Sequence, residues 1–526
     1  MQSETSRFTL SPGGSSIGVV GAGTMGAGIA LTVLYAGLPV ILQDISGTAL
    51  EKAREYIESN LNRKGLEKNL DLFSVATDLE SLTGSGIVIE AALEDLDLKK
   101  KIFEELSRIC QPGTVLATNT STLPVSVISA ATADPARVAG LHFFNPAPVL
   151  PLVEVVRGSW TSDETLTRLC DFAEFLGKTP VLTRDSPGFI VNRVARPYYG
   201  EALRMLAEGV GNMEEIDLLA ESGAGFRMGP FRLMDLIGID VNYTAMLSMY
   251  EQTFGEPRYR PHWIQASMAA SGALGRKSGR GFYAYDHDET IKSPATPLEA
   301  PTDRGTVWLA PGSWAPALAG LCHEAGYALS PPLPAAPHPL LAILPAGRFE
   351  GHSELLRFLE KNLPARTAIL CQAGDQTLSE MKASALHPER LVGFDGLFIR
   401  SGGPITLTRS GWTLAEASQP IEDFVRALGC TPVWVEDSPA LVLPRLLATL
   451  VNEATFAVLE QVADSETVDL AMRLGVSYPK GPIEWGREIG MDKVLAILEH
   501  LRSEYGEERY RASTLLRRTV RLDSRP

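Results

Sequence analysis

A glycine-rich turn near the start of the chain constrains the fold more than any other feature. An apolar run at 17–20 leads into Gly21-Ala22-Gly23-Thr24-Met25-Gly26, and an apolar stretch with small residues follows at 27–35. A second apolar run at 40–42 ends at Asp44. This order of strand, turn, helix and strand indicates a βαβ unit of about thirty residues. We therefore expect an α/β fold that begins with a Rossmann-type parallel sheet.

The turn itself predicts a site for a dinucleotide. Gly21 permits the tight turn, Gly23 lets the backbone approach a pyrophosphate, and Gly26 lets the helix pack closely on the sheet. The helix N-terminus supplies free N–H groups for phosphates, which adds Thr24 and Met25 to the predicted cofactor-binding residues. The alternative interpretation is a structural turn in a flavodoxin-like sheet.

Asp44 indicates which dinucleotide binds. It lies 44 − 21 = 23 positions beyond Gly21, the spacing at which an acidic residue accepts hydrogen bonds from the adenosine ribose. Its charge repels a 2′-phosphate, and the following Ile45-Ser46 offers no arginine to reverse that effect. The predicted cofactor is therefore NAD rather than NADP.

Later apolar runs predict the rest of this sheet and its boundary. Further strands of one parallel sheet are expected at 86–89, 114–117, 138–141 and 153–156. From Asp185 onward the apolar spacing is helical, and this second unit closes near 279–283. A stretch rich in Pro, Thr and Asp follows and is typical of a linker.

The second half of the chain repeats the first. At a constant offset of 437 − 185 = 252 residues, the halves share an Asp-Ser-Pro motif, a glutamate, an aspartate and a Gly-Pro motif. The matched pairs begin at Asp185 and Asp437, Glu201 and Glu453, Asp217 and Asp469, and Gly229 and Gly481. Unbroken register over such a length indicates an internal duplication.

Five parts follow from the repeat. They are an NAD-binding Rossmann domain (1–184), a helical domain (185–285), a linker (286–305), a reduced Rossmann-like domain without a nucleotide loop (306–434) and a second helical domain (435–526). The predicted fold is thus a parallel-sheet domain plus an all-α domain, followed by a degenerate copy of both.

His142 and Glu154 form a candidate catalytic pair. His142 follows the run at 138–141, so it lies near the carboxyl end of a strand, where ligands bind in open α/β sheets. Glu154 lies in an otherwise apolar strand, and a buried carboxylate needs a partner. A neutral imidazole accepts an alcohol proton near pH 7, and a carboxylate on its other nitrogen fixes the tautomer. The alternative is a structural salt bridge.

Four segments resemble those of L-3-hydroxyacyl-CoA dehydrogenases. They are 142–146 (His-Phe-Phe-Asn-Pro), 153–156 (Val-Glu-Val-Val), 119–123 (Asn-Thr-Ser-Thr-Leu) and 185–193 (Asp-Ser-Pro-Gly-Phe-Ile-Val-Asn-Arg). The resemblance implies that His142 is the general base and that Glu154 orients it. It also implies that Ser121 hydrogen-bonds the substrate oxygen and that Asn192 helps to hold the reacting carbonyl.

The same resemblance implies further contacts with the two ligands. Glu94 and Lys99 match positions near the nicotinamide half of NAD, for which the alternative is a solvated helix face, and Asn119 is a further cofactor-binding residue. Substrate binding is assigned to Ser121, Asn192, Asn145 and Lys64. Arg63 and Lys68 lie beside Lys64 where the family uses basic residues against CoA phosphates, but an ordinary charged helix surface explains at least two of these three.

The second copy lacks these residues. Ala310-Pro311-Gly312 replaces the glycine-rich turn, and a Pro-rich stretch at 330–339 replaces the region of Asp44. The equivalents of His142, Glu154 and Asn192 are Asp395, Thr406 and Pro444. We expect the second half to bind no NAD and to catalyse nothing.

The resemblance implies reversible NAD-dependent oxidation of (3S)-3-hydroxyacyl-CoA to 3-oxoacyl-CoA by a stand-alone dehydrogenase. The duplicated form resembles bacterial long forms that act on 3-hydroxybutyryl-CoA or 3-hydroxyadipyl-CoA, including those of phenylacetate degradation. It also resembles the β-oxidation multienzymes, although this chain has no room for a hydratase half. The alternatives are a dehydrogenase of a free hydroxy acid or sugar acid, and a crystallin-like NADH-binding protein.

Short members of the family dimerise through their helical domains. We therefore expect 440–498 to pack on 188–247 within one chain, as an internal pseudo-dimer with one active site, and a homodimer of whole chains remains open.

Composition excludes several other classes. The net charge is −15 with no block of Lys or Arg, which disfavours nucleic acid and anionic membranes as partners. Five widely spaced cysteines form no CxxC pair, so we expect free thiols in a cytoplasmic protein and no metal ligands. We also expect neither a membrane span nor a signal peptide.

Overall fold

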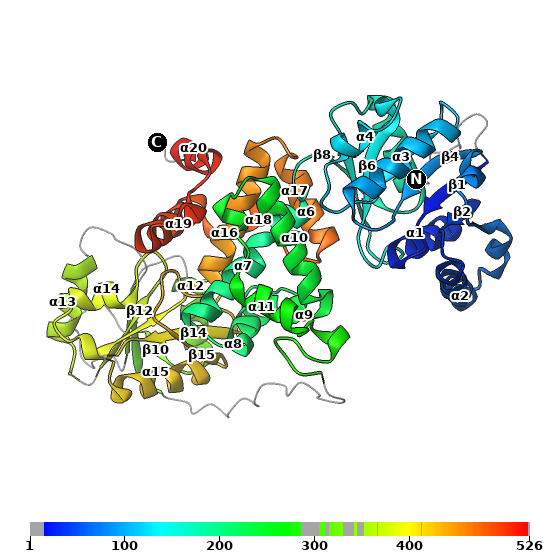
Figure 1. Cartoon of the computed structure of the whole chain (residues 1–526). Helices are drawn as coiled ribbons and strands as arrows, with labels where there is room; N and C mark the ends of the chain where they lie inside the picture. The colour runs from blue at the N-terminus through cyan, green and yellow to red at the C-terminus, as the bar shows by residue number, and fades with distance from the viewer. Residues whose placement is uncertain are drawn as a thin grey trace, which may run out of the picture. The chain divides into compact units, whose positions relative to one another are not determined.

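The computed structural model describes residues 15–285, 304–310, 315–329, 341–344, 352–365, 367–411 and 413–523 (Figure 1). The chain divides into two compact units. Unit 1 comprises residues 1–194 together with 457–481, and unit 2 comprises residues 195–456 together with 482–526. Each unit therefore combines segments from both copies of the repeat.

An eight-stranded sheet forms the centre of unit 1, in the order β3-β2-β1-β4-β5-β6-β7-β8 (Figure 1). The strands are β1 (Ser16–Val20), β2 (Val40–Gln43), β3 (Phe73–Ala76), β4 (Ser85–Glu90), β5 (Val115–Thr118), β6 (Val138–Phe143), β7 (Leu152–Arg157) and β8 (Thr179–Arg184). All neighbours pair in parallel except β6 and β7. Every strand expected from the sequence is present.

The expectation of one fully parallel sheet is wrong at β7, which runs antiparallel to β6. The connection from Phe143 to Leu152 contains only 151 − 143 = 8 residues. A parallel crossover needs about a dozen residues or more, whereas an antiparallel neighbour can be reached by a short loop. The loop length therefore sets the direction of β7.

Helices cover both faces of this sheet because its strands are apolar on both sides. One core contains buried residues of α1 (Thr24–Tyr35), α2 (Gly47–Lys64) and α5 (Asp163–Phe175), together with Ile17 and Val19 of β1. The other core contains α3 (Leu96–Ile109), α4 (Val125–Ser129) and Val20. Helix α6 (Val191–Val194) ends the first segment of unit 1.

Unit 2 contains the helices expected after Asp185 and after Asp437. From the first copy these are α7 (Arg196–Glu208), α8 (Met213–Leu218), a π-helix η4 (Leu219–Gly223), α9 (Pro230–Ile237), α10 (Ile239–Gln252) and α11 (Trp263–Ser271). From the second copy they are α16 (Leu443–Leu459), which runs on into unit 1, α18 (Pro482–Ile489), α19 (Met491–Tyr505) and α20 (Thr514–Asp523).

The second sheet also lies in unit 2 and has the order β10-β9-β11-β12-β13-β14-β15. Its strands are β9 (Thr306–Leu309), β10 (Ala328–Leu329), β11 (Leu341–Leu344), β12 (Ala368–Gln372), β13 (Leu391–Phe394), β14 (Pro404–Arg409) and β15 (Thr431–Glu436). Its helices are α12 (Ala315–Glu324), α13 (His352–Asn362), α14 (Leu378–Ala383) and α15 (Ala415–Ala427). The order matches that of the first sheet without a described equivalent of β3.

Strand register confirms the alignment of the two copies at the catalytic positions. Gly140 faces Val156 across β6 and β7, and Gly393 faces Thr408 across β13 and β14. Two residues further along, His142 faces Glu154, and the Asp395 amide donates to the Thr406 carbonyl oxygen at 3.1 Å. Asp395 and Thr406 therefore occupy the positions of the candidate catalytic pair.

The helical repeats contact one another within unit 2. Arg445 of α16 donates from Nε to Glu201 at 2.8 Å and from Nη1 to Glu208 at 2.7 Å. Glu453 of α16 accepts from Arg258 and from the Tyr259 hydroxyl, both at 2.6 Å. The contacts of Arg445 lie within the region expected to pack, 188–247, whereas those of Glu453 lie beyond it, at 258 and 259.

A helix of the second copy also belongs to unit 1. Helix α17 (Ser465–Gly475) packs against α6, β7 and β8 of the first copy. The Arg184 amide at the end of β8 donates to the Val462 carbonyl oxygen at 3.0 Å, and Arg193 forms a 2.8 Å ion pair with Glu460. Neither copy of the repeat is therefore a self-contained unit.

Some expectations fall on parts of the chain that the structure leaves undescribed. Residues 286–303 of the linker, residues 311 and 312, and the Pro-rich stretch 330–339 lie outside the described residues. All five cysteines are free thiols, as expected. Among the described residues, no helix is both long enough and apolar enough to cross a bilayer.

Candidate active site

The glycine-rich turn connects β1 to α1 and has the geometry that each glycine predicts. Gly21 has a φ of 98°, and a Cβ there would lie 2.7 Å from the Ala91 carbonyl oxygen. A Cβ on Gly26 would lie 1.7 Å from the Gly21 carbonyl oxygen. At Gly23 a Cβ would meet open space, and no side chain caps the N-terminus of α1 there. The N-terminus of α1 is thus open to an anionic ligand.

Asp44 lies at the end of β2 and is tied to this turn. One carboxylate oxygen accepts from the Ala22 amide at 2.7 Å, and the other accepts from the Ser46 amide at 2.8 Å. The side chain is half-buried, so its oxygens keep lone pairs on the ligand side. The turn and Asp44 together fit the pyrophosphate and ribose of NAD.

His142 and Glu154 are hydrogen-bonded across β6 and β7. The distance between Nδ1 of His142 and Oε2 of Glu154 is 2.7 Å, and the two residues are 6% and 0% exposed. The other oxygen of Glu154 accepts from the Ile190 and Val191 amides, both at 3.0 Å. A carboxylate only accepts, so Nδ1 of the neutral imidazole carries the proton and Nε2 is left as the basic nitrogen.

Aromatic side chains surround this imidazole. Its centroid lies 4.5 Å from that of Phe144 and 5.9 Å from that of Phe189, both in tilted orientations. Phe144 comes from the loop after β6, and Phe189 precedes the two amides that hold Glu154. These rings exclude water from one side of the pair and strengthen its hydrogen bond.

Asn119 and Ser121 follow β5, the strand next to β6, and Asn192 lies in helix α6. The Asn192 side-chain amide donates to the Ser121 carbonyl oxygen at 3.5 Å, which brings these two predicted substrate residues together. Asn119 accepts from the Phe143 amide at 2.8 Å and so ties β5 to the end of β6. Asn119 therefore supports the strand that carries His142.

Glu94 and Lys99 belong to a partly buried network rather than to a solvated helix face. Lys99 is 1% exposed, and its ammonium lies 2.7 Å from Glu90 and 3.3 Å from Glu94. Glu94 accepts from the Thr120 hydroxyl at 2.6 Å and from the Ser121 amide at 3.0 Å. Burial opposes ionisation, but Lys99 and these hydrogen bonds hold the pKa of Glu94 below its usual value.

Glu90 was missed by the sequence analysis. It is fully buried at the end of β4, bonded to Lys99 and to the Thr118 hydroxyl at 2.7 Å each. An acidic residue closing the apolar run at 86–89 was the available signal, the same one that singled out Glu154.

A cavity of about 590 Å³ lies beside the glycine-rich turn, between α1, α2 and the loop after β6. Asn145, a predicted substrate residue, lines it, and Lys52 and Tyr56 of α2 line it without having been predicted. Lys64 is exposed at the end of α2, where its ammonium lies 4.0 Å from the Tyr35 ring centroid. Lys52 rather than Lys64 is the lysine that lines the cavity.

Sheet topology brings the glycine-rich turn and the imidazole to one edge. Strands β1, β4, β5 and β6 are consecutive and parallel, so their carboxyl ends meet at the same edge. The turn after β1 is three strand spacings from β6, or about 14 Å. A nucleotide cradle at this separation from a carboxylate-bound imidazole defines an NAD-dependent alcohol dehydrogenase site.

Comparison with known families identifies the particular group. Residues 16–186 match the family described as 3-hydroxyacyl-CoA dehydrogenase, NAD binding domain. The C-terminal domain of 3-hydroxyacyl-CoA dehydrogenase matches twice, at 188–285 and at 441–524, which confirms the duplication. The chain belongs to the 3-hydroxyacyl-CoA dehydrogenase family and is an NAD-dependent enzyme of that activity.

Similar proteins include both full-length and half-length relatives. A 3-hydroxyadipyl-CoA dehydrogenase of Escherichia coli (strain K12) is 36% identical over 97% of this chain and 98% of its own length. The crystal structure of 3-hydroxybutyryl-CoA dehydrogenase from Escherichia coli K12 has a TM-score of 0.80 at 35% identity, covering 97% of this chain and 99% of that one. A 3-hydroxybutyryl-CoA dehydrogenase of Clostridioides difficile is 39% identical over 51% of this chain and 99% of its own.

Proposed function

We propose that the chain reversibly oxidises short-chain (3S)-3-hydroxyacyl-CoA thioesters, with His142 as the general base. The observation that carries this proposal is the 2.7 Å hydrogen bond between His142 and the fully buried Glu154. This bond directs the basic nitrogen of the ring away from Glu154. The His142–Glu154 pair lies at the same edge of the sheet as the glycine-rich turn.

Each polar group then has one task. The glycine-rich turn and Asp44 would hold NAD⁺, which would supply the acceptor for the hydride from C3 of the substrate. Nε2 of His142 takes the hydroxyl proton, and Glu154 stabilises the resulting imidazolium. The two peptide N–H groups on Glu154 keep its carboxylate oriented during this step. Ser121 and Asn192 orient the substrate oxygen, and in the reverse direction His142 returns the proton.

The CoA moiety is assigned to the part of the cavity that α2 lines, since the opposite wall at 22–24 is the turn given to NAD. Lys52 supplies a positive charge for phosphates, and Tyr56 offers an aromatic face and a hydroxyl. Asn145 lies in the same wall, in the loop that follows His142. The acyl substrate is proposed from relatives that act on 3-hydroxyadipyl-CoA and 3-hydroxybutyryl-CoA, and thus has about four to six carbons in its acyl chain.

One active site per chain is part of the proposal. In the second copy, other residues stand at the positions equivalent to His142, Glu154 and Asn192, and its sequence has no glycine-rich motif in place of the turn. NADH titrated onto the purified chain and followed by fluorescence should saturate at one equivalent. Two equivalents would contradict this count.

Substrate assays test the reaction itself. Acetoacetyl-CoA with NADH, and 3-hydroxybutyryl-CoA or 3-hydroxyadipyl-CoA with NAD⁺, should turn over with comparable specificity constants. Free 3-hydroxybutyrate and gulonate should be at least a hundredfold poorer. Preference for a free acid would identify a hydroxy-acid dehydrogenase, and NADH binding without turnover of any substrate would identify a binding protein.

Glu154→Gln separates catalysis from binding in the same assays. The amide can donate to Nδ1 and so favours the wrong tautomer, which should lower kcat by roughly a hundredfold while NADH affinity changes little. Unchanged turnover would remove Glu154 from the mechanism.

A further inference from the structure

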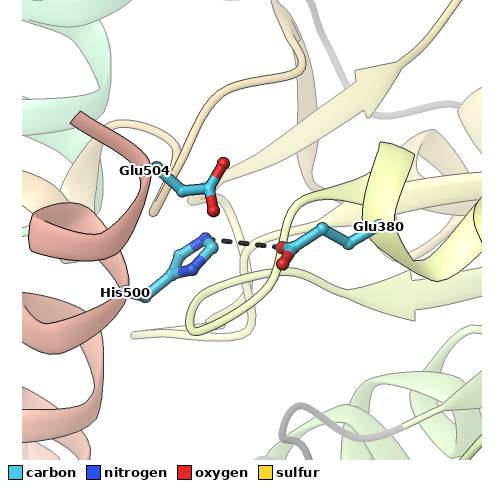
Figure 2. A group of neighbouring side chains, drawn as sticks. All are labelled: Glu380, His500 and Glu504. Atoms are coloured by element: carbon cyan, nitrogen blue, oxygen red, sulfur yellow. Dashed lines mark ion pairs between the residues drawn. The ribbon is translucent and has the colours of Figure 1, made fainter. Parts of the chain in front are cut away.

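Three potential metal ligands converge in unit 2, far along the chain from the residues of the dehydrogenase site. Figure 2 shows His500 and Glu504 on α19 facing Glu380 on α14. One ligand atom from each residue lies within 4.8 Å of the other two. The His500 ring nitrogen Nε2 lies 3.6 Å from Oε2 of Glu380.

Two of the three side chains are held in place by the fold. Glu380 is the third residue of α14, and its carboxylate accepts from the Thr377 amide at 2.7 Å in a capping box. His500 is 5% exposed, so packing fixes its ring. A site with two ordered ligands loses less conformational entropy when an ion binds.

Glu504 supplies the adjustable third ligand. It follows His500 by four residues, so both lie on one face of α19. Its side chain is exposed and can rotate toward the other two. Ligands of a tetrahedral ion with bonds of about 2.0–2.1 Å lie about 3.3 Å apart, so the observed cluster closes with a shift of about 1 Å.

This cluster is specific to the second copy. The equivalent of Glu380 in the first copy is Val127, since 380 − 253 = 127, and the offset follows from the matched amides of Val125 and Leu378. The equivalents of His500 and Glu504 are Ser248 and Gln252 at an offset of 252. An offset of 251 gives Met249 and Thr253 instead, so the first copy has no histidine or carboxylate at any of the three positions.

We propose that Glu380, His500 and Glu504 bind one divalent transition-metal ion, Zn²⁺ in particular. One imidazole with two carboxylates is a donor set that suits zinc, and Mg²⁺ and Ca²⁺ prefer oxygen ligands only. Two carboxylates beside a neutral imidazole also place a net charge of −2 where a cation is favoured. The ion links α14 of the second sheet to α19 of the helical repeat, and water completes its coordination on the exposed side.

Cobalt substitution gives a direct test. After dialysis against a chelator, the full chain should bind one Co²⁺ with visible absorption bands of a tetrahedral or five-coordinate site, and Zn²⁺ should displace it. Zn²⁺ should also raise the thermal midpoint by a few degrees. Absence of stoichiometric binding at 100 μM metal would overturn the proposal.

Three variants locate the ion. His500→Gln and Glu504→Gln should each weaken Co²⁺ binding at least tenfold, and Glu504 is exposed enough for its substitution to leave the fold intact. The matched control is His387→Gln, since His387 forms a surface ion pair with Glu389 at 3.3 Å elsewhere in the same unit. Equal loss in the control, or none in Glu504→Gln, would show that the cluster is an ion pair without a metal. Acetoacetyl-CoA reduction should be unchanged in all three, which keeps this test independent of the proposed function.

Discussion

The two copies of the repeat have the same strand order and the same register, yet only one carries the candidate catalytic pair. Where His142 faces Glu154 in the first sheet, Asp395 faces Thr406 in the second. In the first pair, the Glu154 carboxylate accepts from two peptide amides and from Nδ1 of His142, which leaves Nε2 of the imidazole available as a base. The Asp395 carboxylate instead accepts a hydrogen bond from the Leu397 amide, at 2.8 Å. The sheet is thus retained without the groups that bind and convert a ligand.

What the second copy does retain is packing. Asp437 accepts from the amides of Leu378 and Ser379, just as Asp185 accepts from those of Val125 and Ser126. The helices α16 and α17 also contact first-copy segments in units 2 and 1 respectively. The second copy thus shares with the first the hydrogen bonds that hold its own sheet to its helical segment, but not the His142–Glu154 pair.

Exchange of His142 should give the largest difference between the copies. His142→Gln should lower kcat by roughly two to four orders of magnitude, about 3–5 kcal/mol, because base catalysis is lost while the NAD cradle is intact. Stopped-flow oxidation of NADH by acetoacetyl-CoA measures the rate, and fluorescence measures NADH binding. Asp395→Asn, at the equivalent position, should leave kcat within twofold. Near-normal turnover in His142→Gln would mean that another group transfers the proton.

Asp395 should in turn govern stability rather than turnover. Burial raises the pKa of its carboxyl to about 7, so the folded chain holds a proton that the unfolded chain releases near pH 4. The free energy of unfolding therefore falls as pH rises from about 4 to about 7. Above pH 7 it falls no further through this group. Asp395→Asn removes this titration.

Asp395→Asn should raise the free energy of unfolding above that of the parent chain by about 2–4 kcal/mol at pH 8, and should not change it near pH 4. Urea unfolding at a series of pH values measures it, and the amide oxygen can still accept from the Leu397 amide. A gain that does not vary with pH would show that Asp395 does not titrate in this range.

The sequence predicted the parts of the site that depend on local patterns. An apolar strand ending in a glycine-rich turn has one common fold, so β1, α1 and Asp44 followed directly. An acidic residue in an apolar strand requires a partner, and this rule paired Glu154 with His142 before any coordinates. The direction of β7 was wrong because loop length was not weighed against the crossover a parallel strand requires.

Features that depend on tertiary contacts did not show in the sequence. The strands β3 and β8 are half-exposed, so they lack a continuous apolar run, and β10 has only two residues. Lys52 and Tyr56 become candidate binding residues only because the fold places them in the wall of the cavity. The placement of α17 in unit 1 results from long-range packing, which no spacing along the chain encodes.

Two equivalent glycines give a matched test of that placement. A Cβ on Gly475 of α17 would lie 2.7 Å from Leu152 and 3.6 Å from Phe144, whose ring lies beside the His142 imidazole. A Cβ on Gly223 would lie 2.7 Å from Leu443 in the second copy. Gly475→Val and Gly223→Val should each lower thermal stability to a similar extent through overpacking. Only Gly475→Val should reduce kcat/KM, by about tenfold, because Phe144 contacts His142. Equal losses of activity in both variants would mean that α17 has no special influence on the site.

Asp44 gives an effect of similar size, on cofactor preference alone, and it separates the cofactor-binding turn of the first copy from a purely structural turn. Asp44→Ala should raise the kcat/KM for NADPH relative to NADH by about tenfold, because a carboxylate that repels a 2′-phosphate is removed. The KM for NADH should also rise, since the variant loses the 2.7 Å hydrogen bond that holds the Ala22 amide in the turn. Glu51→Ala removes an exposed carboxylate from the nearby helix α2 and controls for net charge alone. An unchanged ratio of kcat/KM for NADPH and NADH in Asp44→Ala would show that Asp44 does not bind the ribose. An equal change in Glu51→Ala would show that the preference comes from the general negative charge of this region.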